Sequence, residues 1–175
     1  MNRGVVLRNN LIENVKVLEK PELGYPALNC VYYDDELSGQ TLVNNTFRNC
    51  YAGLLLGGGR DNQIIGNTFI NMTSYAITFD ARGLGWQKDF CFYNKSDPSA
   101  SGELVTDLFA RHYNVPPYST AYPTLPGLLS DRPCTPVGNV ISGNSFCNAA
   151  KGFLDVSPAQ ASAWGSTVEN NIEKC

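Results

Sequence analysis

The sequence has no long hydrophobic run, few basic residues and a single histidine. Its 175 residues contain no stretch of about 18 apolar residues, so no segment is expected to span a bilayer. The formal net charge is −3 and the pI is near 5.1, which argues against nucleic acid or an anionic membrane as the main partner. The opening MNRGVVLRNN also lacks the apolar region of a signal peptide.

Several metal and nucleotide motifs are missing as well. The cysteines show no CxxC spacing and no pairing with histidine of the kind that binds zinc. The glycine run GGGRDN (57–62) lacks the Lys and the following helix of a phosphate-binding loop. Calcium is possible among clustered aspartates, but no EF-hand-type loop supports it. We therefore expect no metal site and no cofactor.

Six cysteines and three glycosylation acceptor sequences indicate a secreted, oxidised protein. The acceptors are Asn44, Asn71 and Asn94, although Asn-rich repeats also generate such sequences by chance. An extracellular location would require a leader, and more chain is expected before the N-terminus. We expect disulfides Cys91–Cys134, Cys30–Cys50 and Cys147–Cys175.

One Asn-containing phrase recurs along the chain. It occurs as VVLRNNLIEN, TLVNNTFRN, IIGNTFIN and VISGNSFCN, and incompletely as TVENNIEK. Its second Asn falls at Asn10, Asn45, Asn67, Asn144 and Asn171, with spacings of 35, 22, 77 and 27 residues. Twenty-two residues fit one coil of a parallel β-helix, and the longer gaps fit coils that carry insertions.

The repeat predicts an all-β fold, a right-handed parallel β-helix (solenoid) of about six coils. Residues 1–175 are expected to form one domain, the C-terminal part of a longer β-helix. Asn should stack over Asn at the corners, because Asn tolerates left-handed backbone and bonds neighbouring backbone groups. Phe47, Phe69 and Phe146 should stack in the core. An Asn-rich β-sandwich is the alternative.

The repeat stops between residues 83 and 137. This excursion holds seven of the ten prolines and the only histidine. Glu103 to His112 is predicted to form a short helix with Ser101 as its N-cap, and the remainder an ordered, Pro-rich loop or lid. Because long loops in compact domains tend to be functional, we expect it to form one wall of a groove.

The second strand of each coil carries the candidate chemistry. Aligning VYYDD (31–35), LLLGG (54–58), ITFDA (77–81) and FLDVS (153–157) places Asp34, Gly57 and Asp80 in register. With rungs about 4.8 Å apart, the Asp34 and Asp80 carboxyls would be about 6–10 Å apart, which overlaps the separation in inverting glycosidases. The glycines would leave a slot for a sugar. The candidate catalytic residues are Asp34, Asp35, Asp61 and Asp80, and the candidate substrate-binding residues are Arg60, Arg82, Tyr33, Trp86, Lys88, His112 and Tyr118.

Some of these candidates have a plainer explanation. Arg60 and Asp61 can be structural, because Asp and Arg at β-helix corners often bond the backbone of the next rung. His112 can make a hydrogen bond within its loop instead of contacting substrate, and the same two explanations apply to Tyr118 and Tyr122. Asp35 can replace Asp34 if a bulge shifts the register.

The stretches VYYDDELSGQTLVNNTF, GGGRDNQIIGNTFINMTSYAITFDARGLGW and AYPTLPGLLSDRPCTPVGNVISGNSF carry a family resemblance. The chain resembles the right-handed parallel β-helix superfamily of pectate lyases, polygalacturonases and related glycosidases, and more narrowly the parallel β-helix repeat-containing proteins. The stretch from Tyr33-Asp34-Asp35 to Ser38-Gly39 is similar to one in β-helix glycosidases. The chain departs from the superfamily in having fewer coils than its enzymes usually contain.

The resemblance implies cleavage of a complex polysaccharide. In hydrolases two carboxylates perform it, and Asp34 or Asp35 matches best. The alternative is a non-catalytic glycan-binding or structural β-helix protein. A polysaccharide lyase is third and would use a base and a neutralising cation, for which Arg60, Arg82 and Lys88 are available. The expected partner is a glycan, with self-association possible through an open N-terminal rung.

Overall fold

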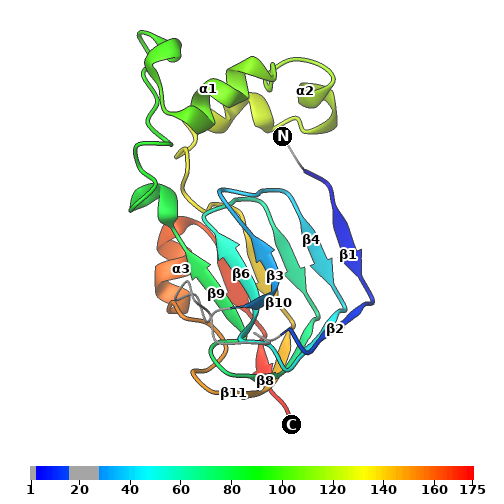
Figure 1. The fold of residues 1–175 in the computed structure, drawn as a ribbon. Coiled ribbons are helices and arrows are strands. Elements are labelled where there is room, and N and C mark those ends of the chain that lie inside the picture. The colour runs from blue at the N-terminus through cyan, green and yellow to red at the C-terminus, as the bar shows by residue number, and fades with distance from the viewer. Residues whose placement is uncertain (1–2, 16–27) are drawn as a thin grey trace. The chain divides into compact units, whose positions relative to one another are not determined.

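The structure, a computed structural model, describes residues 3–15 and 28–175. Its strands form three sheets in which all neighbouring strands are parallel, and the chain passes from one sheet to the next within each turn (Figure 1). This arrangement is the predicted parallel β-helix. The first sheet has β1 (Val6–Arg8), β4 (Thr41–Val43), β7 (Gln63–Ile65), β10 (Val140–Ser142) and β12 (Thr167–Glu169).

The other two sheets complete each rung. The second has β2 (Leu11–Glu13), β5 (Thr46–Arg48), β8 (Thr68–Met72), β11 (Ser145–Ala149) and β13 (Ile172–Glu173). The third, called the β3 sheet, has β3 (Asn29–Tyr33), β6 (Ala52–Gly57) and β9 (Ile77–Asp80). The first two sheets have five strands each, so the described residues form five stacked rungs, close to the expectation of about six coils.

The chain divides into two compact units. The β-helix unit runs to Asp80 and resumes at Pro136, and the inserted unit is Ala81–Thr135. The β-helix unit contains one helix, α3 (Pro158–Trp164). The inserted unit contains α1 (Glu103–Ala110), α2 (Tyr118–Ala121) and three 3-10 helices, η1 (Arg82–Leu84), η2 (Pro98–Ala100) and η3 (Leu125–Ser130). None of the helices in the described ranges has the length and apolar character needed to cross a membrane.

The predicted Asn ladder runs through the β-helix unit. The side-chain oxygen of Asn67 accepts from the Asn45 backbone N–H at 2.9 Å, and that of Asn144 accepts from the Asn67 N–H at 2.8 Å. The Asn67 amide also donates to the Leu42 carbonyl at 2.9 Å. Asn10 and Asn171 continue the ladder at its two ends. Each amide thus satisfies backbone groups that a corner would otherwise leave unpaired.

A second ladder comes from the last Asn of the repeated phrase. Asn14, Asn49, Asn71 and Asn148 are linked amide to amide, at 2.9–3.1 Å. All four have φ between 57° and 59°, the left-handed conformation that Asn adopts more easily than other non-glycine residues. This Asn belongs to the repeated phrase, but a ladder at this position was not among the predictions.

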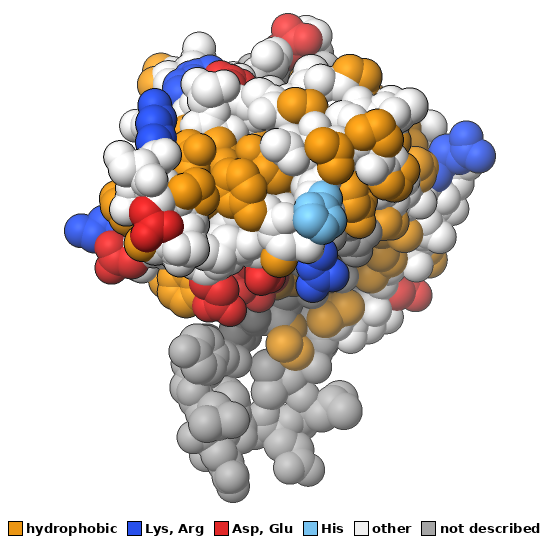
Figure 2. Space-filling model, turned by 90° about the horizontal axis from the view of Figure 1, so that it is seen from above, with side chains coloured by type: hydrophobic (Ala, Val, Ile, Leu, Met, Phe, Trp, Pro, Cys, Tyr) orange, Lys and Arg blue, Asp and Glu red, His pale blue; other side chains and the backbone are white. Residues whose placement is uncertain are grey.

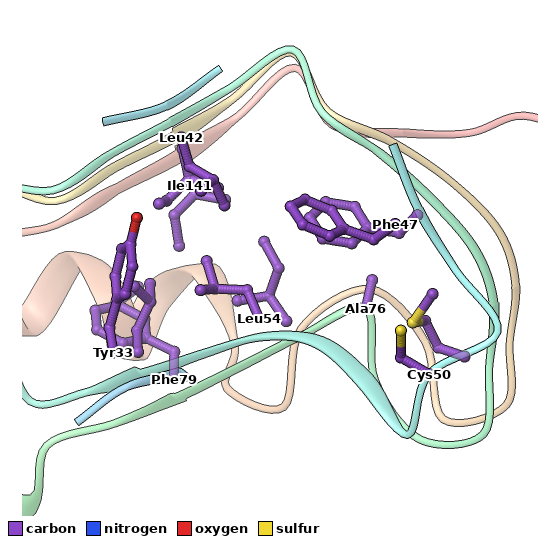
Figure 3. Packing of buried hydrophobic residues seen from close by; sticks show 14 residues of the cluster. Tyr33, Leu42, Phe47, Cys50, Leu54, Ala76, Phe79 and Ile141 are labelled. Carbon is purple, nitrogen blue, oxygen red and sulfur yellow. The ribbon is translucent and has the colours of Figure 1, made fainter. Parts of the chain in front are cut away.

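Apolar side chains fill the interior between the three sheets (Figure 3). Phe47 and Phe69, paired in register on β5 and β8, stack with ring centroids 5.1 Å apart. Phe146 continues the register beside Phe69, but its ring packs on Phe153 at 5.4 Å. Burial of each such side chain contributes about 1.5–3 kcal/mol, so the stacked rungs supply their own core.

All three predicted disulfides are present: Cys30–Cys50, Cys91–Cys134 and Cys147–Cys175. The first and third join residues of neighbouring rungs of the β-helix unit. The second lies within the inserted unit and joins residues near its two ends.

The inserted unit has a small core of its own rather than the loop structure expected. Val105, Tyr113, Leu125 and Leu129 are buried together, and burial, with Tyr93 nearby, raises the pKa of Tyr113. The predicted helix is confirmed, but it ends at Ala110 and its N-cap is Gly102. Ser101 was expected as the cap and instead accepts a hydrogen bond from the Asn94 N–H.

The glycine run GGGRDN allows two backbones to approach closely. A Cβ on Gly59 would overlap the carbonyl oxygen and carbon of Leu37, on the turn of the preceding rung. In the same turn, the Glu36 N–H donates to the Gly57 carbonyl at 2.8 Å. Close backbone packing therefore explains the run, and because Gly57, Gly58 and Gly59 are buried, the open slot for a sugar expected above them is wrong.

Gly59→Ala is expected to destabilise the β-helix unit by about 2–3 kcal/mol, because the clash is with backbone and relaxes poorly. Urea denaturation measures the change. Gly127→Ala is the control, since an added Cβ there meets only Ser130 Oγ at 4.0 Å. Equal stability of the two variants would contradict the close contact at Gly59.

Candidate functional site

The outward face of the β3 sheet carries the predicted carboxylates in the predicted register. Tyr33 pairs with Leu56, and Gly57 pairs with Asp80, so Asp34 follows Tyr33 at the level of Gly57. On β9, Ile77 and Phe79 are buried, whereas Thr78 and Asp80 are half-buried, which is the alternation of a strand with one face inward. Asp34 and Asp80 therefore lie two rungs apart on one face, with Gly57 between them.

Asp34 begins a tight turn at the end of β3. The Leu37 N–H donates to the Asp34 carbonyl at 2.9 Å, and the Asp34 side chain accepts from the Asp35 N–H at 3.0 Å. Asp35 and Glu36 follow with φ of 40° and 62°. The backbone pairing of β3 with β6 shows no bulge before Asp34. Asp34, and not Asp35, therefore continues the register of the strand.

Tyr33 was predicted to contact substrate, but its side chain lies in the core (Figure 3). Burial raises its pKa to about 12. The neighbouring Tyr32 is 50% exposed, as expected for the outward position next to an inward one. The aromatic side chain available on this strand is therefore Tyr32.

Asp155 joins this face and was not among the predicted site residues. Leu154 bridges to Ile77, and the Asp155 carboxylate accepts from the Phe79 N–H at 2.7 Å. The alignment of FLDVS was wrong by one residue, because it placed Phe153 rather than Leu154 opposite Ile77. With the correct register, the Asp in this stretch would have indicated a third carboxylate on the face.

Partial burial of the carboxyl group raises the pKa of Asp155, and the negative charge of Asp80 raises it further. The bond from the Phe79 N–H acts in the opposite direction but does not outweigh burial. Asp80 and Asp155 are thus neighbouring carboxylates in unequal surroundings, an arrangement typical of acid–base sites and also found in structural clusters.

Asp155→Asn is expected to remove part of the pH dependence of stability. Because the pKa of Asp155 is raised in the folded state, the protonated carboxyl group contributes its full stabilisation when the pH is below 3.8, the ordinary pKa. This contribution is lost as the pH rises through the raised pKa. The variant should therefore gain stability relative to the wild type between about pH 4 and pH 7, measured by urea denaturation. Asp155→Ala should lose about 1–3 kcal/mol throughout, because the Phe79 N–H loses its acceptor. A constant difference between Asp155→Asn and wild type across this range would contradict the argument.

Arg60 and Asp61 form a corner with Arg3. Asp61 has φ of 61°, and its carboxylate pairs with Arg3 at 3.1 Å and with the Arg60 Nε at 3.5 Å. Backbone bonds join Asp61 to Val137 and Arg60 to Gly39 of the neighbouring rungs. Arg60 is 9% exposed. These contacts favour the structural explanation for Arg60 and Asp61 over a catalytic or substrate-binding one.

A protein-family comparison covers the part of the chain that holds this face. The family described as "Periplasmic copper-binding protein (NosD)" matches residues 3–95, more than half of the chain. The chain belongs to the NosD family. The match includes the first three rungs, with Asp34, Gly57 and Asp80, and ends before Asp155. No curated protein and no solved structure matches the chain.

Membership of the NosD family agrees with the β-helix and with a location outside the cytoplasm. The three disulfides independently indicate an oxidising compartment. The narrower resemblance to pectate lyases and polygalacturonases receives no support from these comparisons beyond the shared fold.

The remaining predicted contacts lie in the inserted unit, only the start of which falls within the NosD match. The Arg82 guanidinium carbon lies 5.3 Å from the ring centroid of Trp86, whose side chain is 71% exposed. Lys88 and His112 are exposed, and Tyr118 packs against the core of the unit. Figure 2 shows hydrophobic side chains on one face of the molecule with the single histidine beside them. Arg82, Trp86, Lys88, His112 and Tyr118 belong to the inserted unit, whereas Asp34, Asp61 and Asp80 belong to the β-helix unit.

The three predicted glycosylation acceptors have different surroundings. Asn44 is exposed with φ of 53°, and Asn94 accepts hydrogen bonds from the Ser96 and Asp97 N–H groups. Asn71 belongs to the outer ladder, where its amide donates to Asn49 and its oxygen accepts from Asn148. Glycosylation at these positions stays a prediction.

Proposed function

We propose that the protein is carbohydrate-active and binds a polysaccharide on the outward face of the β3 sheet. The register of Asp34, Gly57 and Asp80 carries the proposal. Two rungs of about 4.8 Å would separate the backbones of the two aspartates by about 9.6 Å, and leaning of the side chains would bring the carboxyls within the range of inverting glycosidases, about 6.5–9.5 Å. Exposed Tyr32 supplies an aromatic surface on the same face.

Asp34 and Asp80 would divide the reaction between them. In an inverting hydrolase one carboxylic acid protonates the leaving glycosidic oxygen, and the other carboxylate removes a proton from the attacking water. Asp80 lies beside Asp155, whose pKa is raised first by burial and then by the negative charge of Asp80. Asp34 is exposed at the end of β3, two rungs from Asp80.

Non-catalytic glycan binding is the second candidate. It is favoured by the turn at Asp34, because one oxygen of that carboxylate already accepts from the Asp35 N–H. A carboxylate that is held in a turn can still accept hydrogen bonds from sugar hydroxyls. Such binding needs no second carboxylate at a catalytic distance. A lyase, the third possibility, is less supported, since Arg60 is buried at a structural corner.

The family description also names copper. Copper in proteins is held mainly by imidazole, thiolate or thioether ligands, whereas the outward face of the β3 sheet offers hydroxyl and carboxylate oxygens. No step of the proposed function uses copper. Calcium, with its preference for oxygen ligands, remains compatible with these aspartates.

A panel of extracellular polysaccharides tests the proposal with the wild-type chain. Binding is measured by affinity electrophoresis, and cleavage by new reducing ends and by absorbance of unsaturated products. New reducing ends without unsaturated products support a hydrolase, and unsaturated products support a lyase. Binding without cleavage supports the second candidate, and absence of both over the whole panel contradicts carbohydrate activity.

A further inference from the structure

We infer that this member of the NosD family keeps the family's β-helix but has no copper site built from imidazole, thiolate or thioether ligands. The inference stands apart from the proposed carbohydrate function, because it rests on which donor atoms the chain offers. Copper in proteins is held mainly by His nitrogen and by Cys or Met sulfur, usually from three or more residues.

Cysteine does not supply ligands in the oxidised chain. All six cysteines are used in the disulfides Cys30–Cys50, Cys91–Cys134 and Cys147–Cys175, and none is free. A thiolate is the form of cysteine that binds a metal, and a disulfide offers none. Three of the six cysteines lie within the segment that matches the family, and all three are bonded.

Histidine and methionine also offer few ligands. The only histidine is His112, beyond the matched residues 3–95 and on the surface of the inserted unit. The sequence has two methionines, of which Met72 is 2% exposed within the hydrophobic core and Met1 lies outside the described residues. The matched segment therefore offers one thioether, which is buried, and no imidazole.

Contacts between protein groups join the described rungs of this chain. The Asn ladders, the stacked core and the disulfides join each rung to the next. The chain therefore has the β-helix without the usual donors for copper.

Copper titration of the oxidised chain, without a polyhistidine tag, tests the inference. The wild type is mixed with Cu(II), or with Cu(I) kept reduced by ascorbate, and then passed over a chelating resin while thiol assay confirms intact disulfides. We expect fewer than about 0.1 retained copper ions per chain, and no rise in melting temperature with added copper. A polyhistidine-tagged form of the same chain must retain copper and shows that the assay works.

A second variant separates donor chemistry from fold. Thr68 and Ser145 face outward in register on neighbouring rungs, with their hydroxyl oxygens 3.1 Å apart. The double variant Thr68→His/Ser145→His should retain copper well above the wild type, because it places two imidazoles side by side. Retention of one copper per wild-type chain, lost in His112→Ala or Met72→Leu, would overturn the inference. Failure of the double variant to exceed wild type would contradict the claim that missing donors are the reason.

Discussion

Asp80→Asn is expected to lower the rate of polysaccharide cleavage by about 10²–10⁴-fold, the usual contribution of a general acid or base. The amide has nearly the shape of the carboxylate but exchanges no proton at neutral pH. The backbone pairing of Gly57 with Asp80 does not use the carboxylate. Initial rates of reducing-end formation on the substrate found in the panel measure the effect, and urea denaturation verifies the fold.

Asp34→Asn should produce a loss of the same order, because the mechanism needs both carboxylates. The matched control is Glu169→Gln, an exposed carboxylate on β12 in a different sheet of the same unit. Its rate should stay within about twofold of wild type, as expected for a surface substitution away from the site. Full activity in either aspartate variant would remove that residue from the catalytic pair. Full activity in both variants would show that cleavage takes place at another site and would leave glycan binding as the role of this face.

Asn67→Ala is expected to destabilise the β-helix unit by about 3–5 kcal/mol, near the upper limit for single substitutions. Asn67 is fully buried, and its side chain accepts from Asn45 and donates to the Leu42 carbonyl and to Asn144. Alanine would leave buried backbone groups on the neighbouring rung without partners. Each such group costs about 1–3 kcal/mol.

The matched control for this prediction is Asn71→Gly in the same rung. Asn71 is an exposed member of the outer ladder and has φ of 58°, which glycine adopts without strain. Its replacement should cost about 1 kcal/mol or less, because water can satisfy the exposed amide partners. Urea denaturation of both variants gives the comparison. Equal, small losses would show that the buried ladder contributes little to stability.

The sequence was sufficient to predict the rung, the principal ladder and the register of the β3 sheet. Those features repeat, and a repeated Asn or Phe has the same environment in every coil, so Asn45, Asn67 and Asn144 could be aligned without a structure. The pairings Cys30–Cys50 and Cys147–Cys175 between neighbouring rungs were also expected, and both disulfides are present.

Features that occur once were harder to predict. Asp155 was missed because the fourth rung meets Ile77 through a single bridge after a long insertion, and a shift of one residue exchanges inward and outward positions. The same alternation places Tyr33 inward and Tyr32 outward, which the alignment of VYYDD could have revealed. The contact between Gly59 and Leu37 depends on the exact path of a turn, which no pattern in the sequence specifies.

Carboxyl footprinting tests most directly the claim that the outward face of the β3 sheet binds carbohydrate. The chain is labelled with a carbodiimide and glycine ethyl ester, with and without the bound polysaccharide, and modification is quantified by mass spectrometry. The account predicts that the polysaccharide protects Asp34 and Asp80, while Glu169 on the other sheet is labelled equally in both samples. Unchanged labelling of Asp34 and Asp80 with saturating polysaccharide would contradict it.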